Sequence, residues 1–250
     1  MLCSSDLITS QYPASYVDSD RDEAIWGPWN DGPLDPTETQ LRVSHDLETD
    51  GYTWDFEQWN KDQSHEDALN IVAGEVDPGA TRDASTGRFV VDFSTIHALD
   101  PTEQATGEFA VDYDIDLDGV SGTATFTDFG PTHFGAAYRY DQTFGGQGSM
   151  DLILDVDLDP AMGSGLDEQL VMHSRWMPDG SGRADVRVSG GDLGEAEGFA
   201  TECWDTSFEV VYALEAHTGA EEGDASLCAF ELPEYPDEET EQELAMYTER

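Results

Sequence analysis

The sequence predicts an all-β fold, an antiparallel up-and-down meander of roughly a dozen strands. Three observations lead to this prediction. Short runs that alternate apolar and polar residues recur, turns rich in Gly, Pro, Asp and Ser separate them, and no long amphipathic helical pattern occurs. The strands repeat every ~8–14 residues, which favours hairpin neighbours over long crossovers. A curved half-barrel, a closed barrel and a sandwich all remain compatible with this pattern.

The clearest predicted hairpin covers residues 107–129. Apolar side chains from Phe109 to Leu117 share one parity. The other parity carries four aspartates: Asp112, Asp114, Asp116 and Asp118. Because successive strand side chains point to opposite faces, this strand has one apolar and one acidic face. Asp118-Gly119 begins the turn, and a second alternating run follows Gly122.

Composition divides the chain into three parts. Residues 1–37 contain several prolines and little periodicity, which predicts an N-terminal arm or linker. Residues 38–232 carry the alternating runs, and we expect one antiparallel β domain there. Residues 233–250 begin with two closely spaced prolines and continue with a dense acidic run, which predicts a disordered tail.

The remaining strands follow from the same alternation and the same turn residues. We expect them over residues 40–44, 51–59, 68–76, 87–96, 135–144, 149–158, 169–176, 183–188, 197–204, 207–214 and 226–231. The run 68–76 also fits a short helix, but its β-branched residues favour a strand. One helical turn is expected within residues 99–104.

The charge of the chain restricts its partners. Fifty-five acidic and ten basic residues give a formal net charge of −45. Such a surface repels nucleic acid and anionic membranes, whereas cationic partners and divalent metals are compatible with it. Scarce lysine and abundant aspartate fit a salt-adapted protein, and codon bias explains them equally well. A hydrophobic fraction of 38% is sufficient for a folded core.

The cysteines indicate an oxidising location. Cys203 and Cys228 each lie within a predicted strand, so we expect a disulfide between them. Such a bridge closes a loop of roughly 25 residues and stabilises the fold by roughly 3 kcal/mol. No CxxC motif accompanies them. A secreted or cell-envelope protein, in the periplasm or at the outer-membrane surface, is therefore predicted.

The start of the chain leaves two interpretations open. Cys3 is followed by small and polar residues, as at the lipidated end of a mature bacterial lipoprotein, and it equally fits an ordinary terminal cysteine. As written, the start has no basic and apolar regions of a signal peptide. No apolar run approaches the ~20 residues of a transmembrane helix.

The sequence contains no recognised catalytic motif and no complete metal-binding motif. The six histidines are scattered, and no nucleophile-elbow or phosphate-loop motif occurs, so no catalytic residue is predicted. Residues 114–119 begin like a calcium loop, but Thr125 stands where an EF-hand needs an acid. A weaker hypothesis places Ca²⁺ among two runs of aspartates: Asp112, Asp114, Asp116, Asp118, Asp155, Asp157 and Asp159. The alternative is a solvated acidic face.

Several motifs together look like a group of uncharacterised secreted or lipoprotein-type bacterial proteins. The resemblance covers roughly residues 38–232. It depends on the 107–117 strand and on these further motifs: Ser174-Arg175-Trp176, residues 180–185, Gly190-Gly191-Asp192-Leu193, residues 202–206 and Cys228. It implies an envelope location and the pairing of the late cysteines, and it implies no activity or catalytic residue.

Three functions remain open at this point. The first is a non-enzymatic secreted or envelope-anchored β domain that acts as a binding or surface module. The second is a carrier of an apolar ligand, based on aromatic residues that otherwise belong to the core: Trp54, Phe56, Phe109, Tyr113 and Phe126. The third is a glycan-binding or glycan-active protein that uses Trp26, Trp29 or Trp59.

Overall fold

The structure is a computed structural model that describes residues 12–30, 32–79, 84–130, 133–158, 165–215 and 218–248. The strands are β1 (Tyr16–Asp18), β2 (Glu23–Trp29), β3 (Thr37–His45), β4 (Tyr52–Asn60), β5 (Leu69–Pro78), β6 (Ser85–Asp92), β7 (Glu108–Ile115), β8 (Gly119–Phe129), β9 (Phe134–Thr143), β10 (Gly148–Val156), β11 (Glu168–Trp176), β12 (Gly182–Gly190), β13 (Glu197–Trp204), β14 (Val210–Leu214) and β15 (Glu221–Gly223). The α-helices are α2 (Phe93–Leu99) and α3 (Glu238–Thr248), and the 3₁₀ turns are η1 (His65–Asp67), η2 (Gly191–Leu193) and η3 (Ala225–Leu227).

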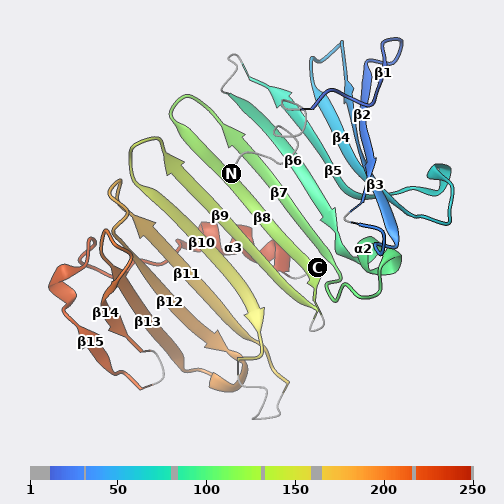
Figure 1. The fold of residues 1–250 in the computed structure, drawn as a ribbon. Helices are drawn as coiled ribbons and strands as arrows, with labels where there is room; N and C mark the ends of the chain where they lie inside the picture. Colours follow the sequence, from blue (N-terminus) through green and yellow to red (C-terminus); the bar gives the residue numbers. More distant parts are fainter. Residues whose placement is uncertain are drawn as a thin grey trace. The chain divides into compact units, whose positions relative to one another are not determined.

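The predicted fold class is confirmed. Strands β1 to β6 pair with their neighbours in the order of the chain, and so do strands β9 to β15. Each of these pairings is antiparallel (Figure 1). Each hairpin connects neighbours, as the short spacing between predicted strands requires.

The strands belong to two compact units, whereas the sequence predicted one β domain over 38–232. Unit 1 comprises the described residues up to Asp114 together with Phe129 and Gly130, and unit 2 comprises Ile115–Asp128 and the described residues from His133 onward. Alternation along the chain identifies single strands, but it contains no information on which strands share a core. The division into two units therefore could not be predicted from the alternation of apolar and polar residues.

In unit 1 the predicted arm contains strands. Pro28 and its neighbours obscure the alternation there, yet β2 pairs with β3 so that Trp26 lies opposite Leu41. The Trp26 indole N–H donates to the Tyr12 carbonyl at 3.0 Å. Leu41 is fully buried. The tryptophans of this segment therefore pack within unit 1, and the arm prediction is replaced by two strands, β1 and β2.

A second difference in unit 1 lies after β6. The strand predicted over 87–96 ends at Asp92, and α2 begins at Phe93, ahead of the helical turn expected over 99–104. Asp92 is the N-cap of α2, because its carboxylate accepts hydrogen bonds from the Thr95 amide at 2.9 Å and the Thr95 hydroxyl at 2.7 Å. Capping thus overrides the β-branched character of this run.

Unit 2 differs from the sequence prediction mainly at the C-terminus. The core there consists of Ala137, Ile153 and Val171, from β9, β10 and β11, with Leu244 of α3 packed against them. The predicted disordered tail is therefore a helix over Glu238–Thr248, behind the sheet in the view of Figure 1. The strand predicted over 226–231 is also wrong, since η3 and an irregular segment occupy it.

Candidate functional site

The register of unit 2 separates its sheet into two chemically different faces. Directly paired residues of antiparallel strands share a face. One row across β9 to β13 joins five polar residues, Arg139, Asp151, His173, Asp185 and Thr201. The row beside it, one residue along each strand, joins five apolar residues, Tyr138, Leu152, Met172, Val186 and Ala200. Because adjacent residues alternate, these rows lie on opposite faces, called here the charged face and the apolar face.

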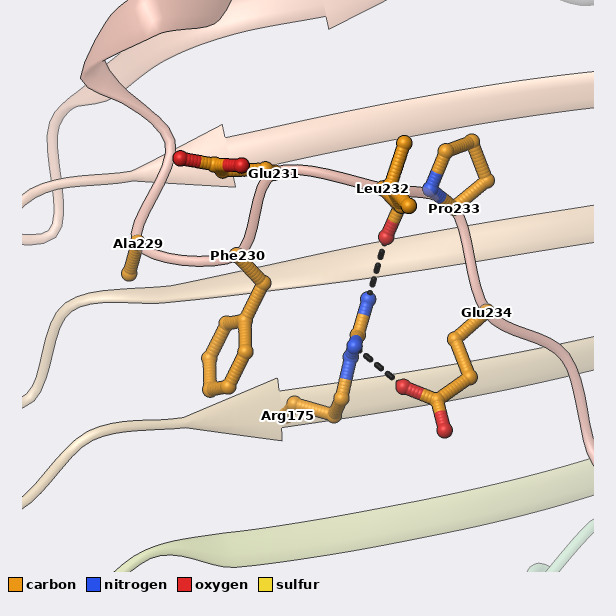
Figure 2. A pocket seen from close by; sticks show the side chains of 7 residues that line it. All are labelled: Arg175, Ala229, Phe230, Glu231, Leu232, Pro233 and Glu234. Carbon is orange, nitrogen blue, oxygen red and sulfur yellow. Dashed lines mark hydrogen bonds and ion pairs between the residues drawn. The ribbon is translucent and has the colours of Figure 1, made fainter.

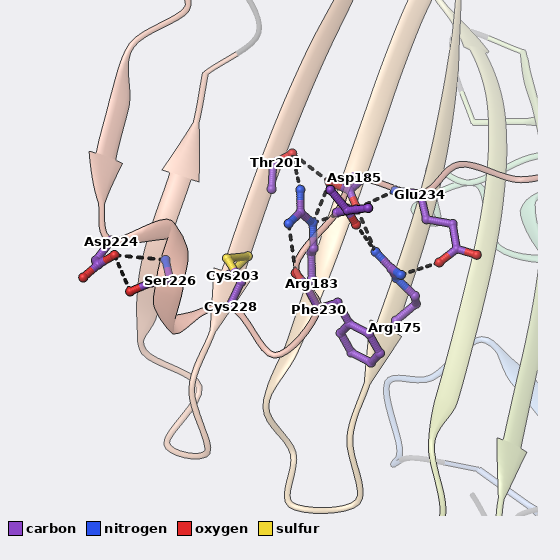
Figure 3. The surroundings of a disulfide bond; sticks show 11 residues. Arg175, Arg183, Asp185, Thr201, Cys203, Asp224, Ser226, Cys228, Phe230 and Glu234 are labelled. Carbon is purple, nitrogen blue, oxygen red and sulfur yellow. Dashed lines mark hydrogen bonds and ion pairs between the residues drawn. A yellow bond between two sulfur atoms is a disulfide. The ribbon is translucent and has the colours of Figure 1, made fainter.

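Asp185 is the centre of the charged face, and its side chain is completely buried. Arg183 Nε donates to both carboxylate oxygens at 2.9 Å, and the Thr201 hydroxyl donates at 2.7 Å (Figure 3). Arg175 Nη2 lies 3.3 Å from the same carboxylate. The backbone amide of Glu234 donates to it at 3.1 Å. Two guanidinium groups and two neutral donors thus compensate one buried charge.

The segment after the disulfide crosses this face. Arg183 Nη1 donates to the Phe230 carbonyl at 3.0 Å, and Arg175 Nη2 donates to the Leu232 carbonyl at 2.8 Å. Arg175 also forms an ion pair with the Glu234 carboxylate, and its guanidinium carbon lies 4.6 Å from the Phe230 ring centre (Figure 2). Sheet arginines therefore fix the main chain of residues 230–234, which carries no regular secondary structure.

Helix α3 also covers the charged face, beside residues 230–234. Arg139 pairs with Glu243, and Arg187 Nη2 donates to both oxygens of Glu241 at 2.6 Å. With Arg175 and Arg183, all four cationic side chains in the described part of unit 2 lie on the charged face. The acidic composition that predicted disorder instead supplies the partners of these arginines. We call residues 228–248 the C-terminal clasp.

The disulfide anchors the start of the clasp. Cys203 on β13 and Cys228 lie at disulfide distance, with Cα atoms 5.4 Å apart, which agrees with the predicted pairing (Figure 3). Cys203 lies on the charged face, since it pairs with Arg183 across β12 and β13. The third cysteine of the sequence, Cys3, lies outside the described residues, and so does Asp159.

An open hollow of about 660 Å³ lies between Arg175 and residues 229–234 of the clasp (Figure 2). Arg175 is the cationic residue among those that line it, and Glu231 and Glu234 are the acidic ones. The Arg175 guanidinium already contacts Glu234, Asp185 and the Leu232 carbonyl. The hollow therefore has no available cation, and we assign no ligand to it.

The apolar face has the opposite character. Its side chains are contiguous across β9 to β13 by register, and each is partly exposed, although they come from interior strands. They are Tyr138, Tyr140, Met150, Leu152, Leu154, Leu170, Met172, Val186, Val188 and Ala200. Ile153 and Val171, their immediate chain neighbours, are only 1% exposed, because α3 covers the charged face.

A row of glycines and tryptophans borders the apolar face at one end. Gly148, Trp176, Gly182 and Trp204 pair in sequence across β10 to β13. A Cβ at Gly148 would lie 2.2 Å from the Trp176 ring, and one at Gly182 would lie 2.2 Å from the Trp204 ring. Each indole thus lies flat over a glycine. Its N–H is bound, Trp176 to Gln142 Oε1 at 2.5 Å and Trp204 to the Gly180 carbonyl at 2.9 Å.

The charged side chains on the apolar side of the sheet are carboxylates. In the described part of unit 2, no arginine or lysine lies on that side. Glu202 on β13 and Glu222 on β15 are exposed and flank Ala213 in the register. Glu168 on β11 is buried, and it accepts from the amides of Leu158 at 2.9 Å and Asp192 at 2.8 Å. These amides hold the pKa of Glu168 below its usual value.

The predicted calcium ligands lie on separate elements. Asp112 and Asp114 are exposed on β7, and Asp112 lies 3.9 Å from Arg88. Asp116 closes its own turn by accepting from the Asp118 amide at 2.7 Å and the Gly119 amide at 2.8 Å. Asp155 lies near the end of β10 and Asp157 follows it, both in unit 2, whereas Asp112 and Asp114 belong to unit 1. The described residues contain no group of three or more potential metal ligands, so calcium binding stays a prediction.

Unit 1 has a polar network that involves Glu57. This carboxylate accepts from Arg42 Nε at 3.2 Å and from the Gln40 amide, whose nitrogen lies 2.7 Å from His65 Nε2. Arg42 also reaches Glu23 at 2.8 Å. The hydrogen bonds that Arg42 donates to Glu57 raise the pKa of Arg42. Burial, followed by the charge of Glu57, raises the pKa of Asp55. The network connects β2, β3, β4 and η1.

The aromatic residues that the sequence analysis proposed as ligand contacts mainly pack against other side chains. Trp54 is 8% exposed, and its ring lies 6.1 Å from Phe56 and 6.2 Å from Phe89. Trp59 is 4% exposed and meets His65 edge-on at 5.2 Å, so it offers no surface to a glycan. Phe109 and Tyr113 also belong to unit 1, whereas Phe126 belongs to unit 2.

Comparisons with protein-family models, curated proteins and solved structures find no match to the chain. No helix of the described residues is both long and apolar enough to span a membrane. The functional argument therefore depends on the chemistry of the two faces of unit 2.

Proposed function

We propose that this protein is a non-enzymatic, secreted or envelope-associated binding module, and that it binds an apolar ligand on the apolar face of unit 2. The single observation that carries this proposal is the contrast between adjacent residues. Ile153 is buried by α3, while Leu152 and Leu154, on the other face, stay partly exposed. Contiguous apolar surface of this kind marks interaction and ligand sites in soluble proteins.

The chemistry of the two faces supports binding without catalysis. The charged face, which contains the His173–Asp151 pair and the Asp185 network, lies on the side that the clasp covers. The apolar face presents side chains with no nucleophile or general base at its centre. An apolar ligand gains roughly 25 cal/mol for each Å² of apolar surface that it removes from water.

The location is proposed on separate grounds. A disulfide between Cys203 and Cys228 persists in secreted and envelope proteins, whereas the reducing cytosol disfavours it. Attachment through a lipid on Cys3 belongs to the same proposal. Mass spectrometry of the protein from its native cells would identify an acylated Cys3 peptide or an unmodified one.

A fluorescent titration tests the binding function. N-phenyl-1-naphthylamine, a neutral apolar dye, should bind the wild-type protein saturably, with increased fluorescence. The double variant Leu152→Thr, Met172→Thr places β-branched polar residues at the centre of the apolar face and should weaken binding at least tenfold. The matched control Leu227→Thr alters an apolar residue of η3 that is 61% exposed and should leave binding unchanged.

Circular dichroism spectra and melting curves of all three proteins show whether the two variants fold like the wild-type protein. A folded wild-type protein that shows no saturable dye binding would contradict the proposed function. Equal binding by a folded double variant would place the dye elsewhere on the protein and would contradict the assigned face.

A further inference from the structure

We infer that the ligand of the apolar face is a cationic amphiphile, an apolar chain that carries a positively charged head group. This inference rests on the proposed function and adds the charge of the ligand. It follows from how the charges of unit 2 are divided between the two faces of its sheet.

The four described arginines of unit 2 lie on the charged face and form ion pairs there. Arg139 and Arg187 pair with Glu243 and Glu241 of α3. Arg175 and Arg183 share Asp185 beneath the clasp. In the described part of unit 2 no arginine or lysine side chain points to the apolar face, so nothing there compensates an anionic head group.

Two carboxylates, Glu202 and Glu222, lie at one edge of the apolar face. The row of Ser174 and Ala184 continues to Glu202, then to Ala213 and Glu222. Both glutamates are exposed and lie at the β13–β15 side of the face. A chain that lies over Met172 and Val186 would bring a head group at one end toward these two carboxylates.

The sign of the interaction follows from simple electrostatics. Opposite charges near a protein surface attract and like charges repel, and salt screens much of this interaction. A cationic head group is therefore attracted, a neutral one is accepted and an anionic one is repelled. The net charge of −45 acts in the same direction at longer range.

The test compares three head groups on one chain length. Decyltrimethylammonium, decyl glucoside and decyl sulfate, each below its micelle concentration, displace N-phenyl-1-naphthylamine from the wild-type protein in 0.1 M and 1 M NaCl. The cation should displace the dye at a concentration at least tenfold lower than the anion. This ratio should shrink at 1 M NaCl, because the screening length falls to about 3 Å.

Two variants separate the edge carboxylates from the overall charge. The variant Glu202→Gln, Glu222→Gln should weaken the cation about threefold or more and leave decyl glucoside unchanged. The matched control Glu197→Gln removes an exposed charge of β13 that lies on the charged-face parity, and it should leave the cation-to-anion ratio nearly unchanged.

The outcomes distinguish this inference from the proposed function. If decyl glucoside binds but the cation binds no tighter than the anion, the cationic ligand is contradicted and the apolar site stands. If the cation preference persists unchanged in the Glu202→Gln, Glu222→Gln variant, the assignment to the edge carboxylates is contradicted. If no amphiphile and no dye binds, the proposed function itself fails.

Discussion

Arg183 and Asp185 lie two residues apart on β12, and Arg183 Nε donates to both oxygens of the buried Asp185 carboxylate at 2.9 Å. Two residues of the same parity on one strand thus form an ion pair beneath the clasp. The carboxylate also holds the amide of Glu234, so a single buried charge links the sheet to the C-terminal segment.

Asp185→Asn should therefore destabilise the protein by about 3–5 kcal/mol, because it leaves two guanidinium groups without their shared anion. Urea unfolding measures this. Glu202→Gln, which changes an exposed carboxylate on the neighbouring strand, should stay within about 0.5 kcal/mol of wild type. Equal stability of Asp185→Asn and wild type would mean that the clasp does not depend on this charge.

Helix α3 is held by packing as well as by charge. Leu244 is 1% exposed against Ala137, Ile153 and Val171, so Leu244→Ala should cost about 2–4 kcal/mol through lost burial and a cavity. Met246→Ala, at a position 60% exposed on the same helix, is the matched control and should have little effect. Thermal melting of both variants decides whether the acidic tail is folded. Identical melts would support the disordered tail that the sequence predicted.

The disulfide should stabilise the clasp in particular. Replacing Cys203 and Cys228 together by alanine should lower the free energy of unfolding by about 2–4 kcal/mol, since the unfolded chain gains the freedom of the open loop. Amide hydrogen exchange should also become faster in residues 228–248 than in β9 to β12. Unchanged exchange in α3 would show that the arginine pairs hold the clasp without the covalent link.

Glu168 predicts a defined dependence of stability on pH. The Leu158 and Asp192 amides lower its folded pKa below the ordinary 4.5, so the folded state favours the carboxylate. Its contribution to stability is complete above about pH 4.5, the unfolded value, and is lost as pH falls through the lowered folded pKa. The melting temperature of Glu168→Gln should therefore be lower than that of wild type at pH 7, and the difference should narrow below pH 4. A difference that widens with acid would contradict this sign.

The net charge predicts a dependence on salt. Self-repulsion of 55 acidic residues destabilises a compact chain, and the screening length falls from about 10 Å at 0.1 M to about 3 Å at 1 M. The melting temperature should rise with NaCl over this range. A flat or falling series would mean that internal pairs already neutralise the repulsion.

Strand positions were predictable because alternation is a local property. The run of β10 shows this, since Leu152 and Leu154 alternate with Ile153 and Asp155 in the sequence as on the two faces of the strand. The Cys203–Cys228 pair was also accessible, because each cysteine lies within a strand-like run near the end of the chain, although the run around Cys228 does not form a strand.

The identity of the covered face was not predictable. Leu152 and Ile153 are equally apolar in the sequence, and only the position of α3 shows which one becomes buried. The acidic residues of α3 predicted disorder when read alone. Arg139 lies 104 residues before its partner Glu243, and Arg187 lies 54 residues before its partner Glu241. Such long-range pairs leave no local signal in the sequence.

The most direct test of the central claim is the position of a ligand on β10 and β11. A decyl alcohol that carries a diazirine at the end of its chain is irradiated with the folded protein, and tandem mass spectrometry locates the labels residue by residue. Binding to the apolar face predicts labels on Leu152, Leu154 and Met172, with Ile153 and Val171 unlabelled. Labels on Ile153 and Val171, or labels spread equally over both parities, would contradict the claim.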